Sequence, residues 1–128
     1  MNYYLSKTVK GDFKEVREKT IESLKDVGFG VISEINMSEK FKEKLGIDFR
    51  EYIILGACNP GFAHEAVKIE EELGVLLPCN VALISQDDGS VKVAAIDAAV
   101  MMSVVENENL DTISGRVNER LKTALLNL

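Results

Sequence analysis

Five short stretches of the chain are rich in valine, isoleucine and tyrosine, and most alternate apolar with polar positions, which predicts β-strands. They are residues 2–9, 29–36, 52–58, 81–85 and 91–96. The third, Tyr52–Cys58, is apolar almost throughout, which indicates a central strand buried on both faces. Residues 86–89 (QDDG) lie between the last two and are typical of a hairpin turn.

Other stretches repeat their apolar residues every three or four positions, as amphipathic helices do. Three of these stretches follow a residue that can cap the start of a helix, namely Asp12, Ser38 or Asp97. Pro60 suits the first turn of a fourth. The expected helices are residues 13–27, 39–45, 60–73, 98–105 and 110–126.

The order of these elements predicts an α+β fold, a two-layer sandwich with helices on one face of a sheet. We interpret it as a ferredoxin-like βαββαβ order with an added hairpin strand and C-terminal helices. A three-layer α/β fold is a weaker alternative, because the hairpin at 86–89 requires antiparallel pairing. No linker or low-complexity segment interrupts the chain, so residues 1–128 are expected to form a single domain.

Several predicted strands are apolar on both faces, whereas helices can cover only one face of the sheet. The C-terminal helix or a second copy of the chain can cover the other, and a homodimer is the expected assembly.

Composition narrows the possible partners and compartments. The chain has 128 residues, 15 basic and 21 acidic, for a net charge of −6. This balance argues against binding nucleic acid or an anionic membrane surface. The start of the chain does not have the pattern of a signal peptide, and no apolar run approaches the roughly 20 residues that span a bilayer. We expect a cytoplasmic protein whose cysteines are free thiols.

The supply of metal ligands is small. A single histidine excludes multi-histidine sites, and two cysteines are too few for a cysteine-only zinc site. A mixed site of Cys58, His64, Cys79 and a carboxylate has suitable ligand types but not the spacing of zinc motifs. We therefore expect no metal and no cofactor.

The densest group of unusual residues follows the third predicted strand. Cys58 and Asn59 lie between the carboxyl end of that strand and the helix that starts at Pro60. Unpaired backbone N–H groups at a helix start favour a thiolate, which makes this turn a candidate for a reactive or ligand-binding thiol. The alternative is that Cys58 is a small apolar residue that ends a core strand.

Cys79 and Asn80 belong to a Pro-Cys-Asn turn that resembles the Cys-Asn-Pro turn at Cys58. The candidates for binding a ligand are therefore Cys58, Asn59, Cys79 and Asn80. If residues 60–73 form a crossover helix between parallel strands, they hold the two cysteines roughly 20 Å apart, at opposite ends of the sheet. A shared site requires that the chain double back before Cys79.

His64 follows Cys58 by six residues and gives a weak candidate for a catalytic Cys–His pair. Such a pair needs the imidazole within hydrogen-bond reach of the sulfur. The alternative is a solvated histidine on an exposed helix turn.

Four segments carry a resemblance to a known family: GFGV at 28–31, KLGID at 44–48, YIILGACNP at 52–60 and GVLLPCNV at 74–81. Over about residues 1–105 the chain resembles the domain of unknown function 302 family. The resemblance implies a small two-layer α/β domain, often dimeric. It implies no activity, and it gives neither cysteine a role.

Three classes of function remain open. The sequence favours a noncatalytic structural or interaction protein. The alternatives are a small-ligand or thiol-handling module at Cys58-Asn59-Pro60, and a cysteine-dependent acyl-transfer or redox enzyme.

Overall fold

The fold is a five-stranded sheet in which every neighbouring pair of strands is antiparallel. We describe it from a computed structural model, which covers residues 2–128. The strands lie in the order β1-β5-β4-β3-β2. Their bounds are β1 Tyr4–Val9, β2 Gly30–Asn36, β3 Tyr52–Cys58, β4 Cys79–Ser85 and β5 Val91–Ile96.

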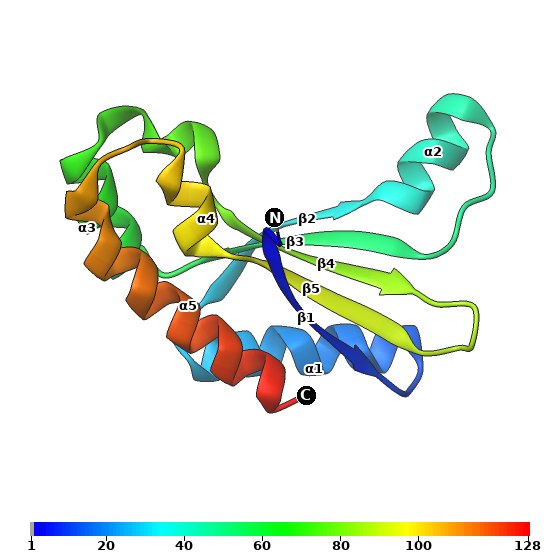
Figure 1. Cartoon of the computed structure of the whole chain (residues 1–128). Coiled ribbons are helices and arrows are strands. Elements are labelled where there is room, and N and C mark those ends of the chain that lie inside the picture. Colours follow the sequence, from blue (N-terminus) through cyan, green and yellow to red (C-terminus); the bar gives the residue numbers. More distant parts are fainter. Residues whose placement is uncertain (1) are drawn as a thin grey trace.

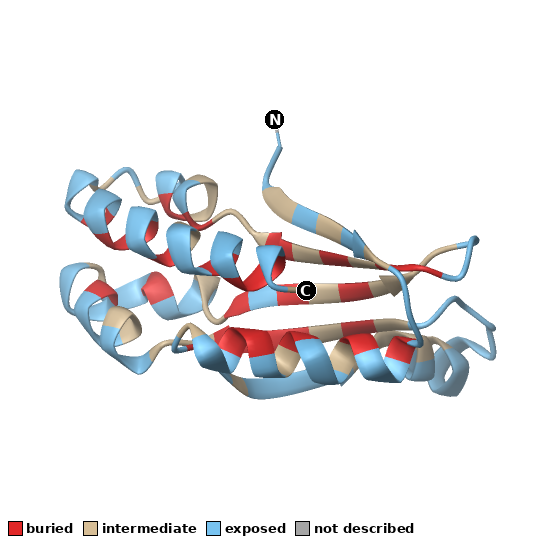
Figure 2. Ribbon diagram, turned by 90° about the horizontal axis from the view of Figure 1, so that it is seen from below, coloured by how far each residue is buried: buried red, intermediate tan, exposed pale blue. Residues whose placement is uncertain are grey.

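Helices cover one face of this sheet, which confirms the predicted two-layer α+β sandwich. The two long helices run along that face, and their inner sides are buried while their outer sides are exposed (Figures 1 and 2). The helical segments are α1 Phe13–Asp26, α2 Met37–Leu45, α3 Pro60–Ile69, α4 Ala98–Ser103 and α5 Asp111–Leu126, with short 3₁₀ turns at Glu71–Leu76 and Glu108–Leu110. Within residues 2–128, no helix has both the length and the apolar character needed to cross a bilayer.

The strand order differs from the ferredoxin-like arrangement in the connection between β3 and β4. Those two strands are antiparallel neighbours, so the chain leaves β3 and enters β4 at the same end of the sheet. Helix α3 ends at Ile69, four residues before the expected end at residue 73, and the 3₁₀ turn Glu71–Leu76 then returns the chain to β4. The crossover expected for residues 60–73 was therefore wrong, and the chain does double back before Cys79.

Short polar side chains fix the starts of several helices. Asp97 accepts hydrogen bonds from the backbone N–H groups of the first turn of α4, as predicted. For α2 the cap is Asn36 rather than Ser38, and the Ser38 hydroxyl instead donates to the Asn36 amide oxygen at 2.7 Å. Asp12 precedes α1 but forms no capping hydrogen bond through its side chain. The predicted cap is therefore confirmed at Asp97, whereas at α2 the side chain of Asn36 takes the role expected of Ser38.

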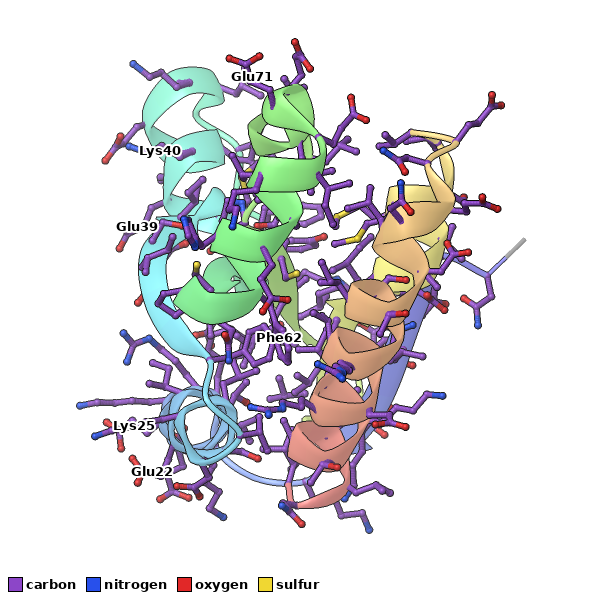
Figure 3. The ribbon with its side chains drawn as sticks, turned by 90° about the vertical axis from the view of Figure 1, so that its left-hand side faces the viewer. Glu22, Lys25, Glu39, Lys40, Phe62 and Glu71 are labelled. Carbon is purple, nitrogen blue, oxygen red and sulfur yellow. The ribbon has the colours of Figure 1, made fainter. Side chains whose placement is uncertain are left out.

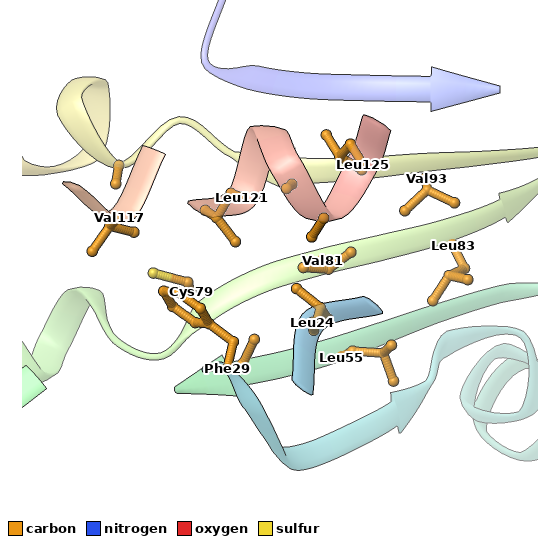
Figure 4. Packing of buried hydrophobic residues seen from close by; sticks show 14 of the residues in the cluster. Leu24, Phe29, Leu55, Cys79, Val81, Leu83, Val93, Val117, Leu121 and Leu125 are labelled. Atoms are coloured by element: carbon orange, nitrogen blue, oxygen red, sulfur yellow. The ribbon is translucent and has the colours of Figure 1, made fainter. Parts of the chain in front are cut away.

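The hydrophobic core lies between the sheet and helices α1 and α5. Leu55, Leu83 and Val93 point into it from adjacent strands, and Leu24 and Leu121 meet them from the helices (Figure 4). All five side chains are at most 2% exposed. Burying a side chain of this size stabilises the fold by roughly 1.5–3 kcal/mol relative to leaving it in water.

In the described part of the chain, no helix packs along the opposite face of the sheet, and this face is poor in charge. Strand alternation brings Tyr4, Ile54, Ala82 and Ala94 to this outer face, where they line a shallow hollow of about 370 Å³. The only charged side chain that lines this hollow within residues 2–128 is Lys92, whose ammonium lies 5.1 Å from the centre of the Tyr4 ring. This is the surplus apolar surface that the strand pattern predicted.

Candidate functional site: an apolar cavity with two cysteines

A cavity of about 250 Å³ lies at the end of the sheet where β3 ends and β4 begins. Helices α3, α4 and α5 contribute to its wall together with the sheet. No charged side chain lines it within the described residues 2–128. Its lining consists of Phe29, Ile32, Ala57, Cys58, Asn59, Phe62, Ala63, Ala66, Leu77, Pro78, Cys79, Met102, Ile113 and Val117.

The two cysteines lie at this same end of the sheet, which corrects the expectation that they are far apart. Ala57 is the direct cross-strand partner of Cys79, and Cys58 is the next residue of β3. Both cysteines line the cavity. The physical reason is the antiparallel pairing of β3 with β4, which places the last residues of one strand beside the first residues of the next.

The two thiols differ in environment. Cys79 is 5% exposed and belongs to the core cluster, where Figure 4 shows it near Phe29 and Val117. Cys58 is half-buried. Cross-strand partners point to the same face, so Cys79 shares the helix-covered face with Ala57, whereas Cys58 is the last residue of β3 and lines the cavity from the strand end. The structure contains no disulfide between them within the described chain.

Burial raises the pKa of the Cys79 thiol to about 11, and the neighbouring Cys58 adds to this rise. An apolar environment disfavours the thiolate, because the charge loses its hydration. Cys79 is therefore a neutral thiol at physiological pH, which is the opposite of what a nucleophile requires.

We predict that the two thiols react at different rates with a neutral alkylating reagent. At pH 8 only about 0.1% of a thiol with a pKa near 11 is ionised. In a Cys58→Ser variant, iodoacetamide is expected to modify Cys79 at least tenfold more slowly than it modifies Cys58 in a Cys79→Ser variant. Mass spectrometry measures both rates, and the Cys79 rate should rise as the pH approaches 11. Equal rates in the folded variants at pH 8 would contradict the burial of Cys79.

Asn59 holds the turn between β3 and α3 through both ends of its side-chain amide. The amide oxygen accepts a hydrogen bond from the Phe62 backbone N–H at 3.0 Å, which caps α3. The amide nitrogen donates to the Gly28 carbonyl oxygen at 3.0 Å, which ties the turn to the segment that follows α1. Asn59 also lines the cavity. The helix start predicted at Pro60 is confirmed, and Asn59 is a positioning residue for the cavity wall.

Two other residues singled out from the sequence lie outside the cavity. Asn80 pairs with Gly56 across the strands and is exposed at the outer face of the sheet. His64 is exposed on α3, where Phe62, Ala63 and Ala66 form the side that faces the cavity. Helical geometry turns His64 away from that side. Within residues 2–128, no hydrogen bond joins it to Cys58, so this geometry gives no support to a Cys–His pair.

Most of the cavity wall could not be identified from sequence patterns. Phe29, Met102, Ile113 and Val117 come from three separate parts of the chain and appear in the sequence as ordinary apolar residues. The signal that was present is the pair of alanines at 63 and 66, whose small side chains leave space between α3 and the sheet. Among the described residues, no group of three or more His, Cys, Asp or Glu side chains is placed to hold a metal ion.

Comparison with known proteins gives a family and a solved structure. A family model described as "Domain of unknown function DUF302" matches residues 5–128 and thus includes the C-terminal helix. The crystal structure of an uncharacterized conserved DUF302 protein from Bacillus stearothermophilus is 27% identical, with a TM-score of 0.92. The alignment covers 99% of this chain and 98% of that one. No curated protein matches the chain.

Proposed function

The chain belongs to the DUF302 family, and from that premise we propose that it is a binding module for a small, largely apolar ligand held in the cavity beside Cys58 and Cys79. The observation that carries this proposal is the cavity itself, an apolar space of about 250 Å³ at one end of the sheet. Ligand sites are typically concave and mostly apolar, with few polar groups, and here Asn59 is the polar side chain of the lining.

The size of the cavity sets the size of the ligand. At about 30 Å³ for each water-sized group, 250 Å³ accommodates roughly eight such groups. This suits a chain of about eight carbon atoms or a small ring system, but not a nucleotide. A binding role fits the geometry better than catalysis by a Cys–His pair, because His64 is exposed and lies outside the cavity.

We expect 1-octanol to bind with a dissociation constant of about 0.1–1 mM, a weak affinity suited to its nine non-hydrogen atoms. NMR titration should shift the backbone signals of Cys58, Phe62 and Val117. An Ala63→Phe substitution fills the cavity and should weaken binding at least tenfold. The matched control is Val67→Phe, on the same helix but outside the lining. Unchanged octanol binding in a folded Ala63→Phe variant would overturn the proposal.

A second candidate function, interaction through self-association, is supported by the outer face of the sheet. That face carries Tyr4, Ile54 and Ala82, and Lys92 is the one charged residue that lines it among the described residues, in a chain of which 28% is charged. A surface poor in charge and rich in aromatic and aliphatic side chains is typical of the centre of a protein interface. A second copy is the occupant we propose, because a face can pair with itself around a twofold axis.

A further inference from the structure

We infer that the ligand of the cavity is amphipathic, an apolar chain or ring with a carboxylate or similar anionic head, and that Arg120 binds the head at the rim. This inference rests on the proposed binding function and specifies its ligand class. It starts from the position of one guanidinium group relative to the cavity wall.

Arg120 lies against a residue of that wall. Its guanidinium carbon is 5.0 Å from the centre of the Phe62 ring. Phe62 belongs to α3 and lines the cavity, and Figure 3 shows it on the side of α3 that is nearer α5. On α5, Val117 and Ile113 line the cavity about one turn and two turns before Arg120, respectively. The side of α5 that closes the cavity therefore leads directly to this arginine.

A second contact places Arg120 next to the polar residue of the cavity. A Cβ atom added to Gly28 would lie 3.0 Å from the amide nitrogen of Asn59 and 3.1 Å from a terminal nitrogen of Arg120. The two side chains therefore converge on the same point beside Gly28. Asn59 lines the cavity and Arg120 does not, but both side chains reach the point beside Gly28.

The guanidinium of Arg120 retains most of its hydrogen-bonding capacity. It donates to the Val27 carbonyl oxygen at 3.2 Å, which uses one of its five N–H groups. Arg17 and Arg50 each form an ion pair with a carboxylate, whereas none of the ion pairs found within residues 2–128 includes Arg120. Its remaining donors are free to bind a carboxylate in the forked geometry that arginine prefers.

The charge of the whole protein explains why an anionic ligand needs a fixed cation such as Arg120 near the cavity. The chain carries a net charge of −6, so its overall field repels anions. The cavity wall itself is uncharged within the described residues and would not favour a carboxylate. An anionic head therefore needs a local positive partner at the rim, while its apolar part enters the cavity.

The test compares octanoate with 1-octanol, two probes with the same chain length and different heads. In the wild-type protein, octanoate is expected to bind about tenfold more tightly than 1-octanol. Arg120→Gln should abolish that preference and leave the affinity for 1-octanol within twofold. The matched control is Arg116→Gln, one turn earlier on the same helix and also exposed, which should preserve the preference.

Each outcome decides between the two proposals. If 1-octanol binds but octanoate binds no more tightly, the anionic ligand class is wrong while the apolar cavity remains the binding site. If Arg120→Gln keeps the preference for octanoate, another group binds the anionic head and the assignment of Arg120 is wrong. If neither probe binds, both proposals fail. If Arg120→Gln weakens both probes equally, Arg120 only supports Phe62 and the cavity wall, and the inference is overturned.

Discussion

A Gly56→Ala variant is expected to lose about 3 kcal/mol of unfolding free energy, a large share of the stability of a small domain. Gly56 lies in β3, between Asn80 of β4 and Ser33 of β2. An added Cβ would lie 2.8 Å from Cγ of Pro78 and would overlap the Ser33 hydroxyl. The hydroxyl can rotate away, but the proline ring is held by the start of β4, so the strands themselves must shift.

Urea denaturation followed by circular dichroism measures this loss. The control is Gly115→Ala in α5, where nothing lies within 4 Å of the added Cβ and alanine should stabilise the helix by about 0.5–1 kcal/mol. Adding Ser33→Ala to Gly56→Ala should recover only part of the loss, because the contact with Pro78 remains. A Gly56→Ala variant within 0.5 kcal/mol of the wild type would show that β3 tolerates a side chain there, against the expectation.

Placing a carboxylate in the middle of the outer sheet face is expected to separate a dimer into monomers. Ala82 is near the centre of β4, the middle strand of the sheet, and lines the shallow hollow of that face. In a twofold dimer, Ala82→Asp introduces two buried, unpaired carboxylates. We expect the dissociation constant to rise at least 100-fold, because each charge loses its hydration without gaining a partner.

Sedimentation equilibrium measures the effect, with the wild-type chain expected at twice the mass of a monomer. The control is Val75→Asp, at a side chain that is 85% exposed on the 3₁₀ turn Glu71–Leu76 and should leave the dimer intact. Circular dichroism must show that both variants remain folded. A wild-type chain that sediments as a monomer at high concentration would contradict the self-association proposal directly.

Most secondary structure was predictable from the sequence because it depends on local patterns. The apolar run Tyr52–Cys58 and the turn at 86–89 predicted a strand and a hairpin, and both form. Pro60 and Asn59 likewise mark the start of α3 by local capping. The expected burial of Tyr52–Cys58 on both faces was wrong, because Tyr52 and Ile54 lie on the outer face of the sheet and are only half-buried. The two-layer class follows from the number and amphipathic character of these elements.

The pairing of strands was not predictable in the same way, and the site depended on it. A helix between two strands is compatible with a crossover or with a return to the same end of the sheet, and the spacing between Cys58 and Cys79 does not distinguish them. Only the antiparallel pairing of β3 with β4 brings the two thiols to one cavity. Local propensity has no information about which strand becomes the neighbour, because that choice depends on long-range packing.

By itself, the sequence determined most of the strands and helices, the acidic net charge, and the candidate site at the turn Cys58-Asn59-Pro60. The elements and the turn depend on neighbouring residues, and the charge depends on composition alone. The tertiary structure alone decided that Cys79 lies at the same cavity as Cys58, that Asn80 and His64 do not, and that Arg120 lies against Phe62 of the cavity wall. Such contacts join residues far apart in the sequence, and the hydrogen bond between Arg120 and Val27 spans 93 positions. They arise only when burial of the core selects one arrangement of the elements.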